Sequence, residues 1–129
     1  MATELTGSVE ITSRDETVYE EPPGTTKLSR VLIHRTFTGE VDGTSVANLL
    51  LAQGEGGGGY MAQERFTGSL GGRSGTVVFR HGRLNGGPEQ IAFGEIVGGS
   101  GTGELEGVVG KVTFTFSPDG ATVTVALVD

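Results

Sequence analysis

The sequence predicts an all-β fold, a single antiparallel barrel of about eight strands that spans residues 1–129 as one domain. The chain has 24 glycines, and its helix-forming residues never gather into a periodic block long enough for a stable helix. Short β-rich runs recur instead between glycine, proline and aspartate, as in an up-and-down barrel. A chain of 129 residues can bury one hydrophobic core.

Alternation of apolar and polar residues marks each strand. In the second run Val31, Ile33 and Phe37 share one face with Arg35, so either Arg35 enters the lumen or this strand is bulged. The eight runs cover residues 5–13, 27–38, 44–53, 60–70, 75–83, 90–97, 111–116 and 122–128.

The fourth and fifth runs form one long hairpin, and they hold most of the unusual polar residues. Strict alternation places Glu64 on the same face as Tyr60 and Phe66. It likewise places His81 on the face of Val77 and Phe79, which we take as inward. A carboxylate and an imidazole are therefore expected together on an aromatic inner face.

The last three runs follow the same rule. Glu95 is in phase with Phe93, so both are predicted to point inward from the sixth run. The seventh and eighth runs alternate most regularly, and Pro118 in the turn between them indicates a closing hairpin.

The loops and a short repeat complete the fold prediction. Residues 20–26 are expected to form a loop, and residues 54–59 (GEGGGG) a flexible hairpin end or, alternatively, a gate over the barrel mouth. The pattern Thr-Gly-x-apolar-x-Gly occurs at 38–43, 67–72 and 102–107. Glycines inside strands mark sharp bends, so the repeat indicates barrel closure.

Composition excludes several classes of function. The net charge of −7 disfavours nucleic acid as a partner, and no apolar run of membrane-spanning length or signal peptide occurs, so we expect no membrane partner and a cytoplasmic protein. Cysteine is absent and there are only two histidines, His34 and His81, which argues against a zinc or iron–sulfur site. No metal and no cofactor is predicted.

Glu64 and His81 are the strongest candidates for chemistry. As neighbours in an apolar lumen they could form an acid/base pair with shifted pKa values. The alternative is a buried pair that only satisfies hydrogen bonds, or a register shift of one residue that turns both into water. Two glycine-rich loops, residues 71–75 and 99–103, are disfavoured as phosphate-binding sites because neither precedes a helix. A serine nucleophile is disfavoured because no Gly-x-Ser-x-Gly motif occurs.

Residues 66–75 (FTGSLGGRSG), with His81 and then residues 99–105 (GSGTGEL), resemble an uncharacterised family of small bacterial proteins with an allene-oxide-cyclase-like barrel. Residues 27–30 and 35–39 fit the same pattern, so the resemblance covers nearly the whole chain. It implies a calycin-like barrel that self-associates as a homodimer or higher homo-oligomer. Related barrels include cofactor-free cyclases.

Three functions follow from these observations. The first is a barrel whose lumen holds a small, largely apolar molecule for cofactor-free cyclisation, isomerisation or elimination, with Glu64 as base and His81 as relay. The second is a non-catalytic ligand carrier, and the third is a structural or interaction module with a filled core. The predicted substrate-binding residues are Tyr60, Phe66, Phe79, Arg35, Glu95 and Phe93.

Overall fold

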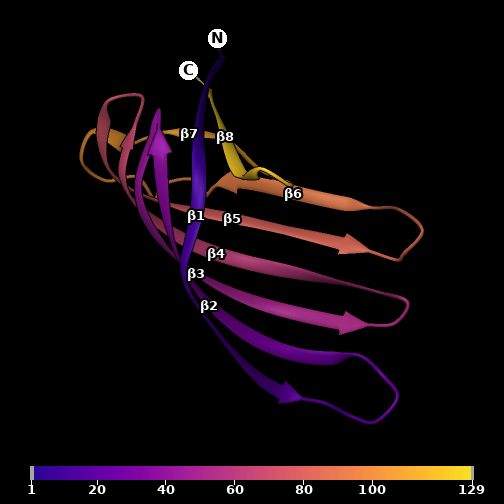
Figure 1. Ribbon diagram of the computed structural model, residues 1–129. Coiled ribbons are helices and arrows are strands. Elements are labelled where there is room, and N and C mark those ends of the chain that lie inside the picture. Colours follow the sequence, from indigo (N-terminus) through magenta and orange to yellow (C-terminus); the bar gives the residue numbers. More distant parts are fainter. Residues whose placement is uncertain (1, 129) are drawn as a thin grey trace.

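The computed structural model describes residues 2–128 and confirms the predicted fold class: eight antiparallel strands form a closed barrel in chain order. In Figure 1 the long strands β2 to β5 run side by side, and the two chain ends lie close together because Ala2 of β1 pairs with Val128 of β8. The strands are β1 (Ala2–Glu20), β2 (Lys27–Gly39), β3 (Val41–Gly54), β4 (Gly57–Leu70), β5 (Arg73–Asn85), β6 (Ile91–Ile96), β7 (Val109–Ser117) and β8 (Gly120–Val128), with a short 3₁₀ helix η1 (Gly103–Leu105) before β7.

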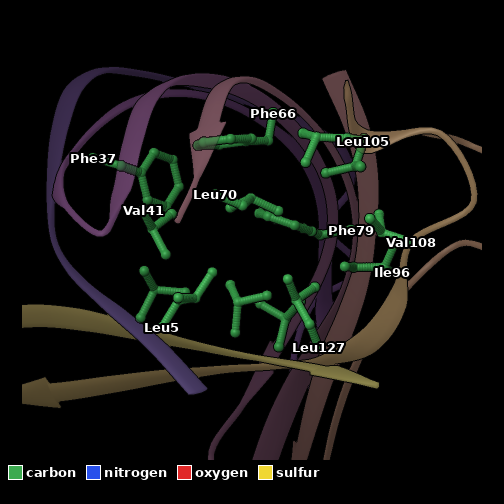
Figure 2. Packing of buried hydrophobic residues seen from close by; sticks show 14 of the residues in the cluster. Leu5, Phe37, Val41, Phe66, Leu70, Phe79, Ile96, Leu105, Val108 and Leu127 are labelled. Carbon is green, nitrogen blue, oxygen red and sulfur yellow. The ribbon is translucent and has the colours of Figure 1, made fainter. Parts of the chain in front are cut away.

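One end of the barrel is filled by side chains, as Figure 2 shows. Phe37 meets Phe66 edge-on at 5.3 Å between ring centroids, and Phe66 stacks on Phe79 at 5.6 Å. Each buried aromatic or aliphatic side chain contributes about 1.5–3 kcal/mol of transfer free energy, so this end carries most of the hydrophobic stabilisation. The cluster comprises Leu5, Phe37, Val41, Phe66, Leu70, Val77, Phe79, Ile96, Leu105, Val108, Val112, Phe114, Val123, Val125 and Leu127.

The Thr-Gly repeat lies where the strands bend at this filled end. Gly43 of β3 pairs with Gly68 of β4, and both have positive φ, 153° and 158°. A Cβ on Gly68 would stand 2.1 Å from the carbonyl oxygen of Asp42, so only glycine allows the two backbones to approach this closely. The third copy differs, because Gly103 begins η1 rather than lying in a strand.

Two predictions about the strands need correction. The first strand was predicted to end at residue 13, but β1 continues to Glu20 because its polar second half pairs with β2, and register shifts after Ile11 and Val18 hide the alternation. The predicted loop at 54–59 is also wrong in part: β4 begins at Gly57, and the backbones of its first glycines pair with β3 and β5.

Away from the filled end, two pairs of neighbouring strands are joined by hydrogen bonds over only part of their length. Strand β8 pairs with β1 only along Ala2–Val9, so the rest of β1 is paired only with β2 among the described residues. Strands β6 and β7 share one residue pair, Glu95 with Lys111. No helix within residues 2–128 is long and apolar enough to cross a membrane.

Candidate functional site

A buried polar network lies on the inner face of β2 to β5, beside the open seam between β6 and β7. Ala62 of β4 pairs with His81 of β5, and Ala47 of β3 pairs with Glu64, so Glu64 and His81 are diagonal neighbours across two strands. Both are buried, Glu64 at 0% and His81 at 2% exposure. Their predicted inward orientation is confirmed by this burial.

Glu64 is held by three groups. His81 Nε2 lies 2.8 Å from Oε1, and the Ser45 hydroxyl donates a short hydrogen bond to Oε2. The Arg35 Nε lies 3.5 Å from the same Oε2 and forms an ion pair with it. Arg35 therefore enters the barrel interior, which resolves the choice left open for the second strand, and its guanidinium lies over the Phe114 ring at 4.8 Å.

The carboxyl of Glu64 is ionised at neutral pH. Burial alone would raise its pKa, but the hydrogen bond from His81, the charge of Arg35 and the Ser45 hydroxyl together outweigh burial and lower the pKa below its ordinary value. An ionised carboxylate only accepts hydrogen bonds, so His81 Nε2 carries the proton and donates it to Glu64.

Tyr60 extends the network toward solvent. Its hydroxyl lies 3.1 Å from His81 Nδ1, and the two rings meet edge-on at 5.6 Å. In a neutral imidazole that carries its proton on Nε2, Nδ1 accepts from the Tyr60 hydroxyl. Burial raises the pKa of the Tyr60 phenol, an effect that the charges of Arg35 and Arg83 oppose, so Tyr60 stays protonated at neutral pH.

A pocket of about 680 Å³ lies at the seam between β6 and β7, beside this network. Its lining includes the inward-facing Tyr60, His81 and Phe114 together with residues from both faces of β6. Gly94 of β6 lets β7 come close here, because a Cβ on it would stand 2.0 Å from the Val112 carbonyl oxygen.

Four predicted site residues are placed differently from the expectation. Phe66 and Phe79 are inside, but at 0% exposure they belong to the packed cluster and do not line this pocket. The inward orientation of Phe93 and Glu95 is wrong: both are exposed and form the outer rim of the pocket, because Gly94 and Ile96 take the inward positions of β6.

Two residues of the site were missed by the sequence reasoning. Ser45 is in phase with Ala47 on the inner face of β3, so alternation could have identified it. Phe114 lies in the seventh run, whose regular alternation predicts a strand but no place in the site. Its place in the site, between the Arg35 guanidinium and the His81 ring, depends on contacts across the barrel interior and leaves no signal in the sequence.

Comparison with known proteins identifies a family. Residues 5–127 match the family described as "Protein of unknown function (DUF3224)". A crystal structure of a protein with unknown function from the same family, from Shewanella oneidensis MR-1, has a TM-score of 0.87 at 27% identity and covers 99% of this chain and 98% of that chain. No curated protein matches the sequence. The likeness to allene oxide cyclases stays a prediction.

Proposed function

The chain belongs to the DUF3224 family, and from its pocket and buried network we propose that it binds a small molecule at the β6–β7 seam and transfers a proton to or from it through Tyr60 and His81. One observation carries the proposal. The hydrogen-bonded series from Ser45 through Glu64 and His81 ends at the Tyr60 hydroxyl, and both Tyr60 and His81 line the pocket.

The residues take distinct roles in this proposal. Tyr60 and His81 are the catalytic residues: as the phenol oxygen takes a proton from the bound molecule, the phenol proton passes to Nδ1 of the neutral His81, and the imidazolium so formed returns a proton through the phenol to another position of that molecule. Glu64 is a positioning residue, because it is fully buried, does not line the pocket and already has three partners. The expected role of Glu64 as the base is thus reassigned to His81.

This arrangement suits cofactor-free isomerisation, elimination or cyclisation. Such reactions need a proton moved at a fixed position and an enclosed apolar surface that orients the reacting atoms. Phe114 and Phe93 both line the pocket and provide apolar surface there. The resemblance of the sequence to a family with an allene-oxide-cyclase-like barrel is in keeping with this class of reaction.

Proton transfer can be tested before the natural substrate is identified. Cyclic enones and aryl ketones are incubated with the protein in D₂O, and deuteration of their acidic C–H groups is followed by proton NMR. We expect deuteration by the wild type, slowed about 10²–10⁴-fold by either Tyr60→Phe or His81→Gln. The matched controls are Tyr19→Phe and His34→Gln, which alter the other tyrosine and histidine at exposed positions and should leave the rate unchanged.

Three results would contradict parts of the proposal. Probes that shift the His81 ring signals but are deuterated equally by wild type and Tyr60→Phe would indicate a non-catalytic ligand carrier. Equal slowing by Tyr19→Phe would show that the exchange occurs outside the pocket. No shift of the His81 signals with any probe would indicate a structural module.

A further inference from the structure

Positive charge gathers around the seam pocket although the protein is acidic. The chain has nine Lys and Arg residues against 16 Asp and Glu, a net charge of −7. The pocket nevertheless has three basic residues in its wall, Arg80, Arg83 and Lys111, and a single acidic one, Glu95. The local excess of positive charge is therefore opposite in sign to that of the whole molecule.

These cations are not neutralised by their neighbours. Within residues 2–128, none of the three forms an ion pair, although Lys111 is the cross-strand partner of Glu95. Arg80 donates to the side-chain oxygen of Gln63 at 2.7 Å, which is a neutral partner. The guanidinium of Arg83 lies 6.0 Å from the centre of the Phe116 ring. Charges left unpaired beside a concave, partly apolar surface raise the local potential and attract anions.

Arg83 is the cation best placed to meet a ligand at the reacting end. It pairs with Tyr60 across β4 and β5, so the two side chains leave the same face of the sheet as direct neighbours. A guanidinium presents two parallel N–H groups that match a carboxylate. Arg35 lies behind Phe114, but its charge is already paired with Glu64, so Arg83 is the cation left to meet the ligand beside Tyr60.

We propose that the ligand of this pocket is a small organic anion, a carboxylate on a flat or extended apolar body. Arg83 binds the carboxylate, Arg80 and Lys111 attract it to the entrance, and Phe114 packs against the apolar part beside Tyr60. This inference rests on the proposed function, since it specifies the ligand class of the same pocket.

The experiment compares acids with amides of the same shape. Cinnamate, naphthalene-2-carboxylate and dodecanoate are each titrated beside the corresponding amide, and the ring signals of His81 are followed by NMR with exposed His34 as internal reference. We expect at least one acid to bind about tenfold more tightly than its amide, a difference of about 1.4 kcal/mol. Added salt should reduce the difference, because it screens the entrance charges.

Variants assign the preference to its residue. Arg83→Gln should bring the acid to the affinity of the amide, whereas Arg65→Gln, which removes an exposed arginine from the outer face of β4, should leave the preference intact. Equal binding of acids and amides would overturn the ligand class while the pocket itself stands. A preference that survives Arg83→Gln would overturn Arg83 as the carboxylate partner. No effect of any probe on His81 would overturn the proposed function as well.

Discussion

The polar residues of the site are diagonal neighbours on consecutive strands. Ser45, Glu64 and His81 come from β3, β4 and β5, and each lies two residue pairs along the ladder from the next, so twisted strands bring their side chains into hydrogen-bond contact. Glu64 and His81 are buried, so bulk solvent does not reach them to replace a lost partner. Each member of the series therefore fixes the orientation of the next, and Glu64 fixes which nitrogen of His81 is protonated.

Replacing Glu64 by glutamine should destabilise the protein and release His81. The change leaves the Arg35 charge buried without a partner. We therefore expect the free energy of unfolding, measured with denaturant at neutral pH, to fall by about 3–5 kcal/mol. Nitrogen chemical shifts of His81 should also show a mixture of tautomers, which loss of packing alone would not produce. Glu95→Gln, at an exposed position, is the control and should change neither quantity.

The stability difference between wild type and Glu64→Gln should also depend on pH. Because the folded-state pKa of Glu64 is lowered, its contribution is fully present above the ordinary value of 4.5 and is lost as the pH falls through the folded-state value. Unfolding curves at neutral and acidic pH should thus converge for the two proteins on acidification. A constant difference over this range would show that Glu64 is not ionised in the folded state.

Alternation predicted the site where strands are uninterrupted and failed where apolar residues face outward. Glu64 and His81 were found because β4 and β5 keep a strict period of two. Phe93 was misplaced because its apolar side chain suggested an inward position, whereas the close crossing of β7 requires Gly94 to be the residue that faces inward. The sequence does not show which strand passes close to β6, so the inward position of Gly94 could not be predicted.

At the scale of elements, the seam between β6 and β7 is the feature that makes the pocket. The other neighbouring strands are joined by longer ladders, but β6 has six residues and shares one pair with β7. All eight strands were predicted from turn residues and alternation. The weak pairing of this one neighbour was not, because it depends on the path of residues 97–108 around η1 rather than on the strands themselves.

Gly94→Ala should disturb the seam selectively. The added methyl group would collide with the Val112 backbone, so β7 must move, and we expect a loss of about 1–3 kcal/mol in the free energy of unfolding together with weaker binding of acid probes. Gly56→Ala is the matched control, since a Cβ there meets nothing within 4 Å and Gly56 does not line this pocket. Unchanged stability of Gly94→Ala would show that the Val112 backbone does not approach Gly94 this closely.

The whole molecule is divided into a packed end and an open end. The large buried cluster fills the ring of strands where β1, β7 and β8 close it, and a smaller group around Val31, Ile33 and Ala47 lies on the inner face of β2 and β3 toward the open part. The predicted lumen is therefore neither wholly hollow nor wholly filled. Sequence alone could not decide this, because the same inward residues occur in both cases.

Amide hydrogen exchange should reveal the same division. Amides of β4, which is paired on both sides along its length, should exchange only through global unfolding, and those of residues 91–94 in β6 through local opening. A bound acid probe should slow exchange in β6 and leave β4 unchanged. Uniform protection of both strands would contradict a locally open seam.

The single residue pair between β6 and β7 has a consequence for how such a protein can diversify. Folding energy resides in the packed end, so side chains around the entrance can be exchanged with little risk to the scaffold. A descendant could acquire a different ligand by altering β6 and the start of β7 alone, while the rest of the barrel is inherited unchanged.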